Sequence, residues 1–128
     1  MLSVLVVDDS SVMRRMVARS LAVSGVPAHE LFEAGDGHEA LRLIRERYVD
    51  IVLCDLHMPV MDGLELVKQM GSDAATADVP VVIVSSERSP GLLAELEELG
   101  VRGFLRKPFQ PEALGHLVRQ VLRLSEPS

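Results

Sequence analysis

The stretch Ile51-Val52-Leu53-Cys54-Asp55 decides how the fold of this chain is interpreted. Four residues of the kind buried in protein interiors lead directly into a single carboxylate. An apolar run without polar alternation is typical of a β-strand whose two faces are both covered, as in a parallel sheet. We therefore expect this strand to carry Asp55 from the core to the edge of the sheet.

Three further apolar runs also lead into polar side chains. Asp8 and Asp9 follow the first of these runs, Ser85 follows the second, and Lys107 follows the third. A fifth, more weakly marked run lies between the first run and the central one. We predict strands at residues 3–7, 30–34, 50–54, 81–84 and 101–105.

The segments after these strands have apolar residues at helical spacing. Capping signals mark where helices begin: Ser10 or Ser11 in the first, Asp62 with Glu65 in the third, and Ser89 before a proline in the fourth. The residues expected on the buried faces of the first and fourth helices are Met13, Met16, Val17, Ala18, Leu21, Leu92, Leu93, Leu96 and Leu99.

A strand followed by a helix therefore recurs five times along the chain. This alternation predicts an α/β fold, with a doubly wound parallel sheet and helices on both of its faces. Because the crossovers in such folds are right-handed, the carboxyl ends of all strands meet at one rim, where functional crevices lie. The polar residues that end the strands are therefore expected to gather there.

The chain has 128 residues, which suits one domain, and we assign that domain to residues 1–124 and a frayed tail to 125–128. A formal charge of −6 argues against nucleic acid as a partner, since phosphate backbones bind basic surfaces. No signal peptide or membrane-length apolar run is visible, so we expect a cytoplasmic protein without a membrane partner. The single cysteine, Cys54, is expected to be an inert buried thiol.

Three carboxylates at one rim, from Asp8, Asp9 and Asp55, repel one another. At about 4 Å and an effective dielectric constant near 20, each close pair costs roughly 4 kcal/mol. Lys107 supplies one compensating cation, and Mg²⁺, which prefers oxygen ligands, would supply another. A carboxylate in such a site is a workable nucleophile for phosphorus, so we expect Asp55 to accept a phosphoryl group, with the Ser85 hydroxyl bonded to one of its oxygens.

Each of these residues also has an ordinary structural interpretation. Asp8 and Asp9 before Ser10 would suit a helix N-terminus, where carboxylates interact favourably with the dipole. Lys107 before a proline would suit a turn, and an aspartate at a strand end is most often a cap. The phosphoryl-transfer interpretation depends on their combination, since they follow different strands of one architecture.

The chain resembles a response-regulator receiver domain, and the stand-alone, chemotaxis-type members most. The resemblance covers residues 4–124 and is carried by four motifs in combination: Val7-Asp8-Asp9-Ser10, Asp55-Leu56-His57-Met58-Pro59-Val60-Met61-Asp62-Gly63, Val84-Ser85-Ser86-Glu87 and Lys107-Pro108-Phe109. It implies a flavodoxin-like (βα)5 fold with the strand order 2-1-3-4-5. No glycine-rich loop follows the first strand, which excludes a dinucleotide-binding site there.

The resemblance also implies roles for individual residues. Asp55 corresponds to the phosphoacceptor. Asp8, Asp9, Asp55 and the backbone carbonyl of His57 correspond to the protein ligands of Mg²⁺, with Asp9 as a direct ligand. Ser85 and Lys107 correspond to the residues that contact the phosphoryl group, and Phe104 to an aromatic switch residue. The Lys107–Pro108 peptide bond corresponds to a cis bond.

Four positions bear on how the family pattern is realised in this chain. Ser85 is often threonine in the family, and serine keeps the hydroxyl group needed for switching. Phe104 is often tyrosine, and phenylalanine would be held inward by burial without a hydrogen bond. His57 and Glu87 occupy the variable positions beside the phosphorylation site and are expected to tune the rate of dephosphorylation.

The function implied is that of a single-domain response regulator in a two-component phosphorelay, not an enzyme that turns over substrate. A sensor histidine kinase or a histidine phosphotransfer protein would phosphorylate Asp55. An effector protein would bind the fourth helix, fifth strand and fifth helix. The protein would be a monomer, and the alternative is a dimer that forms on phosphorylation. One alternative is a phosphate sink or relay without its own output. The other is a phosphohydrolase, which would need an acid where His57 stands.

Overall fold

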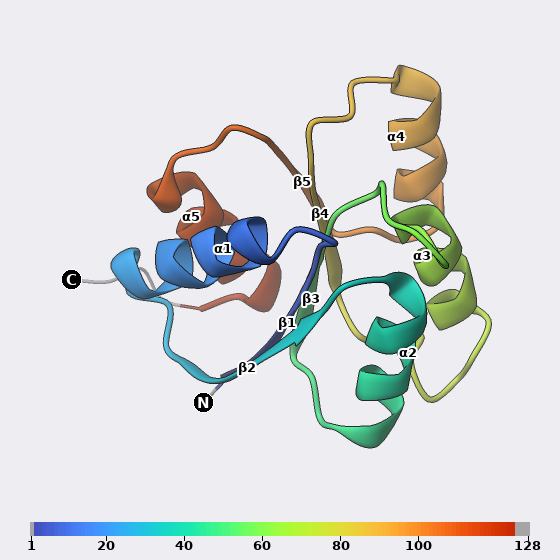
Figure 1. Ribbon diagram of the computed structural model, residues 1–128, viewed down its shortest axis with the longest axis horizontal. Coiled ribbons are helices and arrows are strands. Elements are labelled where there is room, and N and C mark those ends of the chain that lie inside the picture. Colours follow the sequence, from blue (N-terminus) through green and yellow to red (C-terminus); the bar gives the residue numbers. More distant parts are fainter. Residues whose placement is uncertain (1, 125–128) are drawn as a thin grey trace.

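The computed structural model describes residues 2–124, apart from the side chain of His29, so the predicted tail at 125–128 lies outside the described residues. Strands and helices alternate along the chain (Figure 1). The strands are β1 (Leu2–Val7), β2 (Ala28–Ala34), β3 (Ile51–Cys54), β4 (Val81–Ser85) and β5 (Gly103–Arg106). The helices are α1 (Ser11–Val23), α2 (Gly37–Glu46), α3 (Gly63–Gly71), α4 (Pro90–Glu98) and α5 (Pro111–Leu122).

All four strand pairings are parallel, and the strand order is β2-β1-β3-β4-β5. Helices α1 and α5 cover one face of the sheet, and α2, α3 and α4 cover the other (Figure 1). Each face has its own cluster of buried apolar side chains. The prediction of a doubly wound five-stranded sheet of this order, with helices on both faces, is therefore confirmed.

The three central strands are buried along their whole length, which explains why their sequences lack polar alternation. Strand β5 lies at one edge of the sheet and is only partly buried. Its sequence is correspondingly less apolar, with Gly103 at one end and Arg106 at the other. The central strands thus form the rigid base from which the polar residues at the rim project.

Four helices begin at a side-chain cap, where the capping oxygen accepts a hydrogen bond from a backbone N–H in the first turn. Ser10, rather than Ser11, caps α1, and Asp62 caps α3 as predicted. The helices of residues 2–124 are 9 to 13 residues long. None of those helices is long and apolar enough to cross a membrane.

The predicted start of the fifth strand was wrong by two residues, because the amide of Val101 is used in the C-terminal cap of α4. The amide of Val101 donates to the carbonyl of Leu96, and the amide of Gly100 donates to the carbonyl of Glu97. Gly100 has a φ of 96°. This is a Schellman motif, which uses the amide of Val101 to close the helix. The first residue left for β5 is therefore Gly103.

Two residues predicted to be buried are exposed. Met16 is 48% exposed, because the buried face of α1 is formed by Val17, Ser20 and Leu21. Leu99 is 40% exposed, because it caps the end of α4 and only Leu96 of that helix is fully buried. In both helices the apolar pattern is broader than the face that the sheet covers.

Candidate functional site

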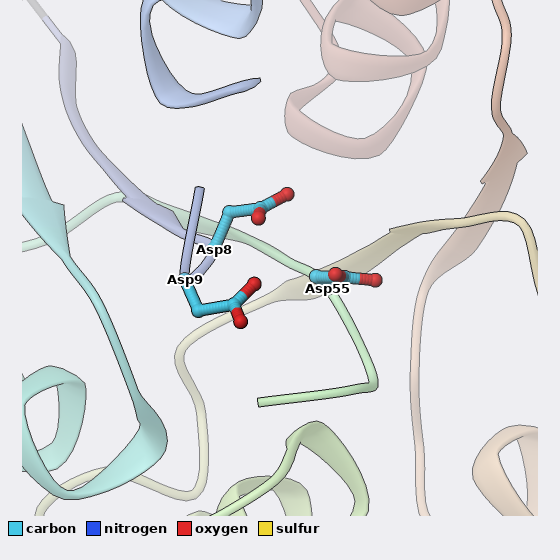
Figure 2. Close-up of side chains that lie close together, drawn as sticks. All are labelled: Asp8, Asp9 and Asp55. Carbon is cyan, nitrogen blue, oxygen red and sulfur yellow. The ribbon is translucent and has the colours of Figure 1, made fainter. Parts of the chain in front are cut away.

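Three carboxylates converge at the carboxyl ends of β1 and β3. Val7 lies opposite Cys54 in the parallel pairing of these strands, so Asp8 and Asp55, the next residues, emerge side by side. Oxygen atoms of Asp8, Asp9 and Asp55 lie within 4.8 Å of one another. Figure 2 shows the three side chains projecting into the same region. The predicted acidic cluster is therefore present in the fold.

Asp8 is the buried member of the cluster, with 4% of its surface exposed. One carboxylate oxygen accepts from the amide of Ser10 at 3.0 Å, and the other accepts from the Nζ of Lys107 at 2.7 Å. Both oxygens are thus engaged with protein donors. Asp9 is exposed, and its carboxylate has no hydrogen-bond or ion-pair partner within residues 2–124. Of the two, Asp9 is the one free to bind a cation directly.

The carboxylate of Asp55 lies in a shallower position, with 13% of its side chain exposed. Its Oδ1 accepts from the amide of Leu56 at 2.8 Å, and its Oδ2 lies 3.6 Å from the Nζ of Lys107. The second contact is an ion pair at long range. Asp55 therefore keeps one oxygen that faces a cation and carries no short hydrogen bond among the described residues.

Lys107 directly follows β5, the edge strand, and its side chain extends from there to the carboxylate cluster. Ser85 pairs with Arg106 in the β4–β5 register, and the amide of Lys107 donates to the carbonyl of Ser85 at 3.0 Å. The Lys107–Pro108 peptide bond is cis. The side chain of Lys107 is 18% exposed, and its Nζ contacts two of the three carboxylates. One ammonium group thus faces three carboxylates, which leaves the cluster with an excess of negative charge.

The donor set fits Mg²⁺. It combines hard carboxylate oxygens with uncompensated negative charge at a site open to water on the Asp9 side. Mg²⁺ binds through one or two carboxylates and keeps several waters, so it does not need a closed protein cage. The carbonyl of His57, two residues beyond Asp55, stays a predicted ligand.

Ser85 and Phe104 lie together on the other side of Asp55. Ser85 is 4% exposed, and its Oγ accepts from the amide of Glu87 at 3.1 Å. Phe104, whose backbone pairs with Ile83, is partly buried against the core. Both residues line a cavity of about 270 Å³ that also contacts Leu93 of α4. Open space therefore adjoins both side chains at the edge of the packed core.

His57 and Glu87 form a contact across the mouth of the site that the sequence did not reveal. The Nε2 of His57 lies 2.7 Å from the Oε2 of Glu87, and the histidine side chain is 65% exposed. The other oxygen of Glu87 accepts from the amide of Ser89 at 3.1 Å. The pair links the loop after β3 to the loop after β4. Its two partners are the same residues that were predicted to tune dephosphorylation.

This contact gives a testable titration behaviour. The hydrogen bond from His57 lowers the pKa of Glu87, and the amide of Ser89 lowers it further. We expect His57→Ala to raise the pKa of Glu87 towards its ordinary value, but only part of the way, because the Ser89 contact remains. Carbon-detected NMR titration of the carboxyl group measures both values. An unchanged pKa in the variant would show that the two side chains do not interact in solution.

Cys54 ends β3 directly before Asp55 and is fully buried. Its Sγ donates to the backbone carbonyl of Asp55. Burial raises the pKa of this thiol well above its usual range, and the nearby carboxylate of Asp55 adds to the effect. The thiol stays protonated, which agrees with the prediction of an inert group.

Known proteins resemble this chain in sequence and in fold. A family model described as the response regulator receiver domain matches residues 4–119. The chain is 34% identical to a chemotaxis protein CheY homolog of Campylobacter jejuni over 94% of this chain and 92% of that protein. It is 33% identical to chemotaxis protein CheY1 of Helicobacter pylori, over 94% and 97%. The structure of chemotaxis protein CheY4 of Vibrio cholerae superposes with a TM-score of 0.85 at 37% identity, over 95% and 99%.

Receiver domains are signalling proteins of two-component systems. They interact with histidine kinases and downstream effectors, and they bind Mg²⁺ at an acidic pocket. The match spans nearly all of the described residues, including the three aspartates of the cluster, Ser85 and Lys107. This chain belongs to the response regulator receiver domain family.

Proposed function

We propose that Asp55 accepts a phosphoryl group from a histidine kinase or a histidine phosphotransfer protein, with Mg²⁺ held by Asp8, Asp9, Asp55 and the carbonyl of His57. One observation carries this proposal: three carboxylates converge, and two of them face the same ammonium group. Asp8 is already engaged at both oxygens, whereas Asp55 faces Lys107 only at long range. This difference favours Asp55 over Asp8 as the nucleophile, and the exposed Asp9, which is unpaired within residues 2–124, is assigned to Mg²⁺.

The transfer forms one bond and breaks one. An oxygen of Asp55 bonds to phosphorus while the bond from phosphorus to the donor imidazole nitrogen breaks, and the electron pair returns to that nitrogen. Lys107 pairs with the transferred group, for which its ion pair with Asp55 leaves it well placed. Mg²⁺, when bound, neutralises charge on the phosphoryl oxygens. The product is an aspartyl phosphate at the surface of the rim.

The response to phosphorylation is proposed to pass through Ser85 and Phe104. The Oγ of Ser85 accepts one hydrogen bond from Glu87, so its own proton is available to donate to a phosphoryl oxygen. Displacement of Ser85 towards Asp55 would alter the cavity that it shares with Phe104, and the ring would follow into it. Because the ring has no hydroxyl group, burial alone would hold it inward. The surface of α4, β5 and α5 would then bind an effector.

The loss of the phosphoryl group is proposed to depend on His57 and Glu87. Their contact joins the loop after β3, which begins at Asp55, to the loop after β4. The pair would set how fast water reaches phosphorus. We expect the aspartyl phosphate to be hydrolysed slowly by water, without a separate phosphatase.

The proposed metal site predicts a change in stability. A ligand that binds only the folded state stabilises it by about 2.7 kcal/mol when present at 100 times its dissociation constant. We expect Mg²⁺ to raise the melting temperature of the protein, because it relieves repulsion among the carboxylates. Asp9→Asn should abolish most of the rise, since Asp9 carries the free carboxylate. Differential scanning calorimetry with Mg²⁺ or with a chelator measures it, and an equal rise in the variant would contradict the assignment.

The signalling role is tested by capturing partners with and without beryllofluoride, which mimics a phosphoryl group on aspartate. An output regulator should bind an effector only in the presence of beryllofluoride and Mg²⁺. Capture of kinase or phosphotransfer proteins alone would instead indicate a phosphate sink or relay. A phosphohydrolase is disfavoured because His57 stands where a carboxylic acid would be required. Steady hydrolysis of p-nitrophenyl phosphate would revive that alternative.

The protein is proposed to act in the cytoplasm, together with the histidine kinase or histidine phosphotransfer protein that phosphorylates it. The unphosphorylated protein is proposed to be a monomer, and the phosphorylated form is the one in which dimerisation would arise. Nucleic acid and membranes are not proposed as partners, in keeping with the net charge of −6. Analytical ultracentrifugation with and without beryllofluoride measures the oligomeric state directly.

A further inference from the structure

Arg14 is a partly buried residue of α1 that lies outside the cluster of carboxylates. Its side chain is 20% exposed, and its guanidinium group makes two directed contacts. The Nη1 donates to the backbone carbonyl of Asp8 at 2.7 Å, and the Nε donates to the Oε1 of Glu33 at 2.8 Å. Arg14 therefore ties the segment after β1 to the neighbouring strand β2.

These contacts complete the fixation of Asp8. Its amide donates to the carbonyl of Ala34 at 3.0 Å, and its carboxylate is held by Ser10 and Lys107. The carbonyl was the remaining polar group of the residue, and Arg14 binds it. Asp8 is thus held at its amide, its carbonyl and both carboxylate oxygens.

The carbonyl of Asp8 matters because it belongs to the peptide unit that joins Asp8 to Asp9. A peptide unit is planar, so fixing the direction of this carbonyl also fixes the amide and the Cα position of Asp9. The carboxylate of Asp9 has no partner of its own within residues 2–124. The backbone that Arg14 holds therefore sets the position from which the Asp9 side chain extends towards Asp55, and the side chain itself is left to turn towards a cation.

Glu33 makes this arrangement specific for arginine. It lies on β2 opposite Val6 of β1, so it approaches Arg14 from a strand that is itself paired to β1. A guanidinium group is a planar fork and can reach the carbonyl and the carboxylate at once. The ammonium group of a lysine is a compact point charge and lacks this fork.

We propose that Arg14 is a positioning residue for the metal site and that Glu33 orients it. This inference rests on the proposed binding of Mg²⁺ at the carboxylate cluster. Two possible effects of Arg14 have opposite signs. As a positive charge it would repel Mg²⁺, and its removal would tighten binding. As a support for the backbone of Asp9 it would favour Mg²⁺, and its removal would weaken binding.

The test compares Mg²⁺ dissociation constants by isothermal titration calorimetry, using Arg14→Lys, Arg14→Gln and the control Arg15→Gln. Arg15 lies exposed on the same helix, so the control removes an equal charge from the same region. Far-UV circular dichroism and urea unfolding establish that each variant is folded at the temperature used. Asp9→Asn serves as the reference for a lost ligand.

We expect Arg14→Lys, which keeps the charge, to weaken Mg²⁺ binding about tenfold, in the range known for residues that orient metal ligands. Arg14→Gln should weaken it as well, and Arg15→Gln should leave it unchanged or slightly tighter. If Arg14→Lys bound Mg²⁺ with wild-type affinity, or Arg14→Gln bound it more tightly, the positioning role of Arg14 would be wrong. The proposed metal site would still stand. If the wild-type protein binds no more Mg²⁺ than Asp9→Asn, the proposed metal site fails, and this inference fails with it.

Discussion

Asp55→Asn is expected to abolish phosphorylation by acetyl phosphate in the presence of Mg²⁺. The amide has no anionic oxygen to attack phosphorus, so no acyl phosphate can form at this position. The fold should be kept, because the amide oxygen of asparagine can still accept from the amide of Leu56 and Lys107 retains its ion pair with Asp8. Intact-protein mass spectrometry measures the fraction that carries one phosphoryl group.

Asp62→Asn is the matched control for this substitution. Asp62 lies in the same loop region and caps α3 through a hydrogen bond from the amide of Glu65. Asparagine caps helices about as well as aspartate, so stability and phosphorylation should both match the wild type. A hydroxylamine-labile adduct that persists in Asp55→Asn would show that another residue is the acceptor.

Gly63→Ala is expected to lower the free energy of unfolding by about 3 kcal/mol, at the upper end for overpacked sites. A Cβ atom at this position would overlap the backbone carbonyl of Asp55 and would lie 2.9 Å from the Cα of Leu56. These are backbone atoms at the centre of the site, so they cannot move aside like the end of a flexible side chain. The overlap should also displace Asp55 and slow its phosphorylation. Urea unfolding and the rate of phosphorylation measure the two effects.

Gly71→Ala provides the control for Gly63→Ala, because Gly71 ends the same helix and nothing beyond its chain neighbours and the backbone of that helix lies within 4 Å of its expected Cβ. Alanine is the better helix former, so this variant should be as stable as the wild type or more stable by up to about 1 kcal/mol. If both variants had equal stability, the close approach of Gly63 to Asp55 would not exist in solution.

The central strands could be predicted from sequence because burial on both faces leaves a plain mark: runs such as 51–54 contain no polar residue. The ends of helices and strands and the limits of their buried faces were harder to predict, since they depend on residues outside the element. Val101 has a strand-like side chain, yet its amide closes α4. Met16 has a helical apolar spacing, yet the sheet does not extend under it. The first error comes from a local helix-capping motif, and the second from the extent of the sheet that covers α1.

The polar residues at strand ends could be assigned to one rim, because parallel topology brings those ends together. The supports of the site could not be found in this way. Arg14 and Glu33 look like ordinary surface charges until the register of β1 and β2 places them in contact. Gly63 stood in a recognised motif, but only the folded loop shows that its hydrogen atom lies against Asp55. The link between His57 and Glu87 likewise joins residues from two separate loops.

The central claim, that Asp55 is the phosphoacceptor, is tested most directly by trapping the phosphoryl group where it forms. The protein is treated with acetyl phosphate and Mg²⁺ and then with borohydride, which reduces an aspartyl phosphate to homoserine. Peptide mass spectrometry then locates the modified position. We predict homoserine at position 55 and at no other aspartate of the cluster. Homoserine at position 8 or 9, or an acid-labile phosphate on His57 without any homoserine, would contradict the account.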